Sequence, residues 1–242
     1  MRAKKSKHIS KDNIIDVIYE NPSHFGSLNE NYITSGILQY LRTSALISSP
    51  RLINILVDIS LYPKVSKKLV LEQSEIINKY GKSISRKALS DMVYLDATIK
   101  ESLRLSSPAN FAHRYMDKDY FLSNGIVLKQ GSTISFSSFT HNRNMKLFGP
   151  SIRSFIPERH LESSSKLEDS GIDDTIWGIR NKCPYISYSS SQLKVIIALI
   201  VRKYYILNSI NGLNQSHPGY KNIITTIPDQ SVIYLKKHYL FI

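Results

Sequence analysis

Residues 177–188 read WGIRNKCPYISY and hold the only cysteine among the 242 residues of the chain. Cys183 follows a glycine and two basic residues, precedes a proline, and leads into an apolar helical run at residues 193–200. A thiolate just before a helix N-terminus is stabilised by the helix dipole and by nearby cations, which makes it a better metal ligand. Free cysteine is also among the most buried residue types, so a small buried hydrophobic side chain is the alternative. The segment alone leaves both interpretations open.

The composition limits the class of protein. A hydrophobic content of 42% with 21% charged residues is typical of a globular chain with one large core or two modest ones. A single cysteine excludes an internal disulfide and is compatible with a reducing compartment. The net charge of +13 raises the question of nucleic acid or anionic membrane, but the basic residues are scattered apart from a cluster at residues 2–7. We therefore expect a solvated basic surface that attracts an acidic partner, and no nucleic-acid partner.

The hydropathy pattern bears on localisation. The first 12 residues are charged and no secretory signal follows them. The longest apolar run, near residues 195–201, is far shorter than the roughly 20 residues that span a bilayer. We therefore expect an intracellular protein without a transmembrane segment of its own.

Helical patterns occupy the first 80 residues. Residues 12–19 predict a short helix that an Asn-Pro pair ends. Residues 32–61 carry apolar side chains at spacings of three and four, with an interruption expected at Pro50 and a kink at residues 46–49. Residues 64–80 predict another amphipathic helix, with Gly81 as its C-cap.

The remainder changes from helix to strand after one clear helix at residues 89–105. The apolar stripe of that helix consists of Met92, Leu95, Ile99 and Leu103. Turn signals at Asn124-Gly125 and Gln130-Gly131 and an alternating pattern at residues 133–137 predict strands, as do residues 223–242, while residues 163–174 predict a polar surface loop. We expect two parts: a basic N-terminal segment with a short helix, residues 1–31, and one domain, residues 32–242.

Three short motifs stand in a fixed order along this domain: KESLR at residues 100–104, FIPERHL at residues 155–161, and the cysteine segment. Each is weak alone, since a Glu and an Arg three residues apart on a helix are most often a solvated surface pair. Together they resemble the C-terminal half of a cytochrome P450 of the fungal type. Glu101 and Arg104 match the ExxR motif of the family's K helix, Arg159 matches the arginine that joins them in a buried triad, and Cys183 matches the axial thiolate of the haem.

The resemblance implies a fold and an activity. The implied fold is mainly α with small β-sheets: a long I-type helix, a K-type helix, a meander, a Cys loop, an L-type helix and a terminal hairpin at residues 228–237. Haem b is the implied cofactor, with Cys183 as the ligand of the haem iron and Arg114 and Arg180 as further cofactor-binding residues. The implied function is a haem-thiolate monooxygenase that oxidises a small lipophilic metabolite, in fungal secondary metabolism, with electrons from a reductase. Family members of this type are usually on the endoplasmic reticulum membrane.

The chain also departs from the family pattern. The cysteine loop is one residue short and lacks its second glycine, and Tyr185 stands where a glycine should follow Cys183. Leu46 and Ile47 occupy the positions of an acid and a threonine in the oxygen-activating helix. Ser48 or Ser49 can serve only if the register slips by one residue, which makes Ser48 the catalytic candidate. The match covers only the C-terminal half of the family fold. The alternative function is therefore a truncated, non-catalytic remnant or an interaction module that binds haem poorly or not at all.

Overall fold

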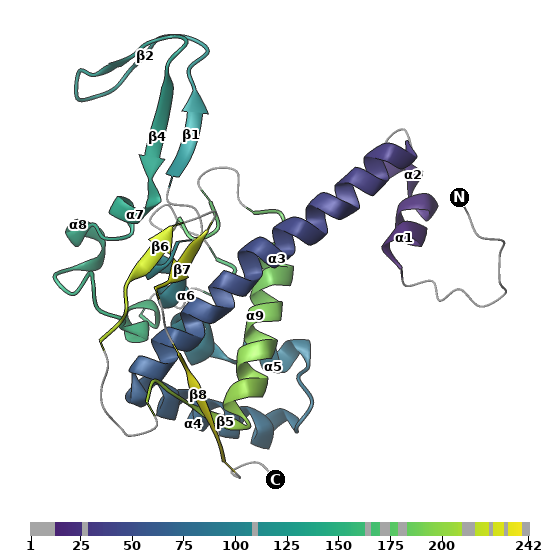
Figure 1. Cartoon of the computed structure of the whole chain (residues 1–242), viewed down its shortest axis with the longest axis vertical. Helices are drawn as coiled ribbons and strands as arrows, with labels where there is room; N and C mark the ends of the chain where they lie inside the picture. Colours follow the sequence, from purple (N-terminus) through teal and green to yellow (C-terminus); the bar gives the residue numbers. More distant parts are fainter. Residues whose placement is uncertain are drawn as a thin grey trace. The chain divides into compact units, whose positions relative to one another are not determined.

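The chain is mainly helical, with four two-stranded sheets among the residues that the computed structural model describes (Figure 1). The described residues are 13–25, 29–107, 111–162, 166–169, 175–178, 183–209, 216–222, 225–229 and 232–238. The expected fold class, mainly α with small β-sheets, is confirmed. The chain forms two compact units, Met1–Ala45 and Leu46–Ile242. The division expected between residues 31 and 32 stays a prediction.

The first unit begins with two short helices, α1 (Ile14–Glu20) and α2 (Pro22–Phe25). The side chain of Asn13 caps α1 by accepting a hydrogen bond from the backbone N–H of Asp16 at 2.9 Å. The predicted short helix is therefore confirmed. Proline is well tolerated in the first turn of a helix, because its missing N–H has no intrahelical partner there, and Pro22 opens α2.

One long helix, α3 (Glu30–Leu61), continues through Pro50. The expected interruption of the helix at Pro50 is wrong, because a proline removes only one backbone donor and the apolar pattern continues on both sides. The segment Asn31–Leu61 is long and apolar enough to cross a membrane, and less than half of its most apolar window is buried. Core helices of soluble proteins meet the same criterion. The expected lack of a transmembrane segment therefore stays a prediction.

The core of the second unit lies among the C-terminal part of α3 and four further helices. These are α4 (Pro63–Tyr80), α5 (Arg86–Ser90), α6 (Val93–Leu105) and α9 (Ile186–Val201). The predicted apolar stripe on α6 is fully buried, and it packs with side chains of the other helices. The largest of these buried side chains are Ile55, Ile59, Leu69, Met92, Leu95, Ile99, Leu103 and Ile197.

Two helices, α5 and α6, replace the single helix expected over residues 89–105. The chain turns at Asp91, whose carboxylate accepts hydrogen bonds from Lys79 and Tyr80 at the end of α4. The N-terminus of α6 has no cap from its own N-cap residue, Met92. Instead the carboxylate of Glu72 on α4 accepts the backbone N–H groups of the first residues of α6. The break is thus stabilised by tertiary contacts. The predicted C-cap of α4, Gly81, is confirmed, with φ at 79°.

All strand pairs are antiparallel: β1 with β4, β2 with β3, β5 with β8, and β6 with β7. The strands are β1 (Phe111–Tyr115), β2 (Tyr120–Phe121), β3 (Val127–Leu128), β4 (Thr133–Ser137), β5 (Tyr204–Leu207), β6 (Tyr220–Asn222), β7 (Thr226–Pro228) and β8 (Tyr234–Lys237). The terminal hairpin expected at residues 228–237 is wrong, because β7 and β8 belong to different sheets. Strand partners are selected by tertiary packing, which a local pattern does not contain.

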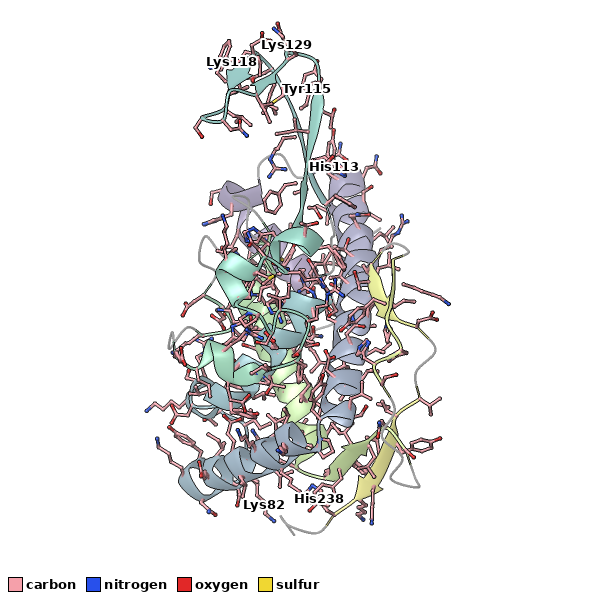
Figure 2. The ribbon with its side chains drawn as sticks, turned by 90° about the vertical axis from the view of Figure 1, so that its left-hand side faces the viewer. Lys82, His113, Tyr115, Lys118, Lys129 and His238 are labelled. Carbon is pink, nitrogen blue, oxygen red and sulfur yellow. The ribbon has the colours of Figure 1, made fainter. Side chains whose placement is uncertain are left out.

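Strands β1 to β4 form one extended hairpin on which β2 and β3 are the outer pair (Figures 1 and 2). Its turns are the two that the sequence predicts. Gly125 and Gly131 have φ angles of 84° and 80°, a backbone conformation that L side chains rarely adopt. Three shorter elements connect this hairpin to the cysteine segment: α7 (Ser138–His141), α8 (Met145–Phe148) and the 3₁₀-helix η1 (Pro157–His160).

Candidate functional site

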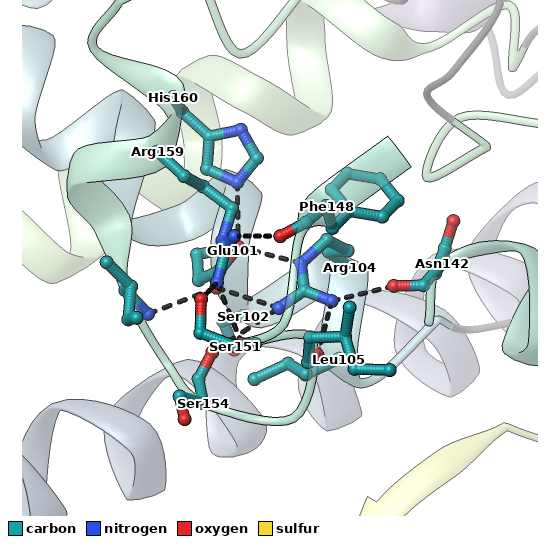
Figure 3. A network of polar contacts seen from close by, with 12 residues as sticks. Glu101, Ser102, Arg104, Leu105, Asn142, Phe148, Ser151, Ser154, Arg159 and His160 are labelled. Carbon is teal, nitrogen blue, oxygen red and sulfur yellow. Dashed lines mark hydrogen bonds and ion pairs between the residues drawn. The ribbon is translucent and has the colours of Figure 1, made fainter. Parts of the chain in front are cut away.

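A buried ionic network joins α6 to η1 (Figure 3). Glu101 and Arg104 lie one turn apart on α6, and Arg104 donates two hydrogen bonds of 2.8 Å to the two carboxylate oxygens. Arg159 on η1 donates a third, from Nε to Oε1 of Glu101, at 2.9 Å. Glu101 is completely buried. The structure thus brings together the three residues that the sequence predicts as a triad.

The network extends beyond the triad. Nε2 of His160 lies 2.8 Å from Oε2 of Glu101, and the backbone N–H of Ile156 donates to Oε1 at 3.0 Å. The remaining guanidinium N–H groups donate to backbone carbonyls of the segment between α7 and η1. Arg104 reaches Asn142 and Ile152, while Arg159 reaches Phe148 and Ser151. Sequence reasoning missed His160, although it follows Arg159 directly in FIPERHL.

The electrostatics of Glu101 indicate a structural role. Burial alone raises the pKa of its carboxyl group, but hydrogen bonds from Arg104 and His160 outweigh that effect and lower the pKa to about 2. Glu101 is therefore ionised at neutral pH, and each of its oxygens accepts charge-assisted hydrogen bonds. Such a carboxylate clamps α6 to η1 and does not transfer protons.

Cys183 lies in a turn directly before α9. Its backbone N–H donates to the carbonyl of Trp177 at 2.8 Å, which closes the loop between them, and Gly178 has φ at 103°. The indole of Trp177 is buried and donates to the carbonyl of Leu167 at 2.7 Å. Leu167 is itself buried, so the surface loop expected at residues 163–174 is wrong at this point. The thiol of Cys183 is half-buried and packs against the core.

A buried arginine on α3 lies beside the cysteine loop. The guanidinium of Arg51 lies 4.7 Å from the centre of the Trp177 ring, and its Nη2 donates to the carbonyl of Ile176 at 3.3 Å. Burial lowers the pKa of Arg51 to about 10, and the charge of a Cys183 thiolate acts in the opposite direction. Sequence reasoning missed Arg51, whose signal is a charged residue directly after Pro50 in an otherwise apolar pattern.

The other predicted site residues are placed as follows. Arg114 lies on the exposed strand β1, where it donates to the carbonyl of His113 at 2.7 Å. Ser48 is half-buried within α3. Arg180 lies outside the described residues. Tyr185 is the N-cap residue of α9 and is 50% exposed, with φ at −100°, a value open to any residue.

The donors around Cys183 fit a haem iron held by a thiolate. The thiol lies at a turn before a helix, and the guanidinium of Arg51 packs on Trp177, whose carbonyl accepts the backbone N–H of Cys183. Nε of Arg51 is buried and has no hydrogen-bond partner in the described part of the chain. A negatively charged group at this position would therefore meet an unused donor. This agreement between the residues and a haem concerns only Cys183, the residue that would bind the iron.

The fold is mainly helical, and α6, which carries Glu101 and Arg104, packs against α9, the helix that follows Cys183. This combination is typical of haem-thiolate proteins. Comparison with known proteins identifies the family. The family model "Cytochrome P450" matches residues 4–187 of the chain. The chain belongs to the cytochrome P450 family.

Curated relatives agree with this assignment. Cytochrome P450 71A19 of Arabidopsis thaliana is 31% identical over 144 residues, which are 59% of this chain and 29% of the relative. Cytochrome P450 4d8 of Drosophila melanogaster is 29% identical over 155 residues, which are 62% of this chain and 33% of the relative. Indoleacetaldoxime dehydratase of Arabidopsis thaliana is 30% identical over 144 residues, with coverage of 59% and 29%. The match thus spans a third or less of each relative. These are plant and insect proteins, so the resemblance to fungal members stays a prediction.

Proposed function

We propose that this chain is the part of a haem-thiolate monooxygenase that provides the thiolate ligand of the haem iron. Such an enzyme inserts one oxygen atom into a small lipophilic molecule. The observation that carries the proposal is the network in which Glu101 and Arg104, both buried on α6, bind Arg159 of η1. Helix α6 also packs against α9, the helix after Cys183. Haem b, when bound to a thiolate, supplies iron that cleaves dioxygen instead of only binding it.

In this proposal each residue has a separate task. Cys183 binds the iron, and Arg51 balances the charge of the thiolate. Glu101 positions η1 and the segment that leads from it to the cysteine. Arg114 and Arg180 contact the haem, as the family resemblance implies, and the hydroxyl of Ser48 replaces the distal threonine. A reductase donates electrons, and the protein is intracellular, at the endoplasmic reticulum membrane.

A second candidate is an interaction module of the same fold that does not oxygenate a substrate. Its support is the chemistry of Leu46 and Ile47, whose side chains have neither an acid nor a hydroxyl with which to deliver protons. The position of Tyr185, where the family has a glycine, also supports it, since a ring there competes with haem for space. The proposal that the substrate belongs to fungal secondary metabolism rests on the sequence resemblance alone.

One experiment separates the two candidates. The purified full chain is titrated with haem, reduced, and exposed to carbon monoxide, and the Soret band is recorded. The monooxygenase proposal predicts stoichiometric binding and a strongly red-shifted band in the wild type, and loss of the shift in Cys183→Ser. Failure of the wild type to bind haem would leave the interaction module. An unchanged spectrum in Cys183→Ser would show that another residue holds the iron.

A further inference from the structure

A buried polar cluster fastens the β6–β7 hairpin to α3 and α6, and the proposed function does not use it. Its centre is the carboxyl group of Asp58 on α3. The hydroxyl of Ser102 on α6 donates a hydrogen bond to Oδ2 of Asp58 at 2.5 Å, and the hydroxyl of Tyr220 on β6 also donates to this carboxyl group. Nε2 of His217, three residues before Tyr220, lies 3.6 Å from Oδ1.

The β6–β7 hairpin depends on contacts with α3 and α6 for its position (Figure 1). Its strands pair over only three residues, and a two-stranded sheet is at best marginally stable in water by itself. Hydrogen bonds between neutral groups help to hold it. Nδ2 of Asn54 on α3 donates to the carbonyl of Thr226 at 2.9 Å, and Oγ1 of Thr226 donates to the carbonyl of Ser107 at 2.6 Å. A change of charge at Asp58 therefore acts on the attachment of the hairpin.

Asp58 has no permanent countercharge in the part of the chain that the structure describes. It is 1% exposed, and no lysine or arginine of the described ranges forms an ion pair with it. Burial is the largest effect on its carboxyl group and raises the pKa to about 7. The charge of Glu101 on α6 also raises this pKa, and that of Arg104, which pairs with Glu101, lowers it. Asp58 therefore takes up and releases a proton near neutral pH.

His217 is a neutral member of the cluster. The backbone N–H of Gly219 donates to Nδ1 of His217 at 3.0 Å, so the hydrogen of the ring lies on Nε2, the atom that faces Asp58. Burial lowers the pKa of His217, which favours the same neutral form. The imidazole therefore offers Asp58 a neutral N–H and no positive charge.

Tyr220 is neutral as well. Burial and the charge of Asp58 raise the pKa of its hydroxyl group, and Tyr62 acts in the same direction. Arg143 acts in the opposite direction and does not outweigh them. The hydroxyl of Tyr220 thus keeps its proton and faces Asp58 as a neutral donor, like that of Ser102.

We propose that Asp58 is a proton-operated latch of the β6–β7 hairpin: the hairpin packs on α3 and α6 while the carboxyl group holds a proton, and it detaches when that proton passes to water. A carboxylate left in the closed cluster has no cation to pair with, and detachment lets water solvate it. The latch is independent of haem binding and of the oxygenase reaction.

The direction of the pH dependence follows from the packed and the detached state. A detached carboxyl group has the ordinary pKa of 3.8, and the packed one has a pKa of about 7. Attachment is therefore strongest below about pH 4, weakens as the pH rises from 4 to 7, and is constant above that. His217 acts in the opposite direction, because its lowered pKa weakens attachment as the pH falls below 6.5. The wild type thus responds to pH less steeply than Asp58 would alone.

Hydrogen exchange of the full chain, measured by mass spectrometry, tests the latch. The variant Asp58→Asn keeps the size of the side chain and is neutral at every pH. At pH 8 we expect the amides of β6 and β7 to exchange roughly tenfold or more faster in the wild type than in the variant, and at pH 4 at nearly equal rates. The matched control is Asp229→Asn, which removes the carboxylate that pairs with Lys221 of β6 at 2.6 Å. This control should show no difference from the wild type that depends on pH.

Urea separates local opening of the hairpin from unfolding of the whole domain, because only the second exposes much surface. We expect low concentrations of urea to accelerate exchange in α6 and to leave exchange in the hairpin unchanged. Equal exchange of the wild type and Asp58→Asn at pH 8, or hairpin exchange that accelerates with urea as that of α6 does, would overturn the proposal. If Asp58→Asn does not fold, the wild type decides the matter. Its hairpin exchange, corrected for the intrinsic effect of pH, must rise between pH 4 and 7, and a constant rate over that range would also overturn the proposal.

Discussion

Replacement of Arg159 by alanine tests the buried network most sharply. The wild-type side chain donates to the carboxylate of Glu101 and to the carbonyls of Phe148 and Ser151. Removal of one partner of a buried ion pair costs about 3–5 kcal/mol, because the remaining charge stays desolvated. Arg104 and His160 still contact Glu101, so we expect the lower end, about 3 kcal/mol of unfolding free energy. That corresponds to a loss of roughly 1–2 M in the urea midpoint.

The matched control is Arg153→Ala, which removes an exposed arginine from the same segment. We expect it to change the unfolding free energy by less than about 0.5 kcal/mol. Equal losses in both variants would refute the claim that Arg159 is part of a buried network.

Acid titration adds an independent criterion for the same network. The lowered pKa of Glu101 stabilises the fold fully above its unfolded value of 4.5, and this stabilisation is lost as the pH falls toward 2. The difference in stability between the wild type and Arg159→Ala should therefore shrink over that interval. A difference that does not change with pH would point to lost packing instead of lost ion pairing.

Three further predictions concern other parts of the chain. Asp58 on α3 is fully buried, and burial raises the pKa of its carboxyl group to about 7. The folded state therefore has its full stability below about pH 4, where Asp58 is protonated, and loses stability as the pH rises through 7. Asp58→Asn should be more stable than the wild type above pH 7 by up to roughly 4 kcal/mol in urea titrations, and this difference should vanish below pH 4. Glu72→Ala removes the cap of α6 and should cost about 1–2 kcal/mol in the same assay, whereas the exposed Glu75→Ala should cost almost nothing. Tyr185→Gly should raise the haem content per chain and Ile47→Thr should leave it unchanged; the reverse order would show that these residues are misplaced around the haem.

The sequence predicts the parts of the site whose information is local. Glu101 and Arg104 share a helix face by spacing alone, and the family motif adds Arg159 across the 54 residues that follow Arg104. His160 and the Ile156 N–H were not predicted, because their contacts with Glu101 depend on the path of η1. The buried cation of Arg51 also depends on tertiary structure, since it requires α3 to pass beside Trp177.

The fold shows the same difference between features set by nearby residues and features set by distant ones. The short first helix, the C-cap at Gly81 and the turns at Gly125 and Gly131 were predicted correctly, because backbone conformation follows from residues close in the sequence. The interruption at Pro50 was not, because α3 continues through it. The break between α5 and α6 was not, because Glu72 caps α6 from another helix. The pairing of β7 with β6 and of β8 with β5 also depends on distant residues.

The most direct measurement for the central claim, that Cys183 is the proximal ligand of a haem iron, is X-ray absorption at the iron edge of the full chain after reconstitution with haem. The account predicts one sulfur atom in the first coordination shell of the wild-type iron and none in Cys183→Ser. An iron shell of nitrogen and oxygen alone in the wild type, or sulfur that persists in Cys183→Ser, would contradict it.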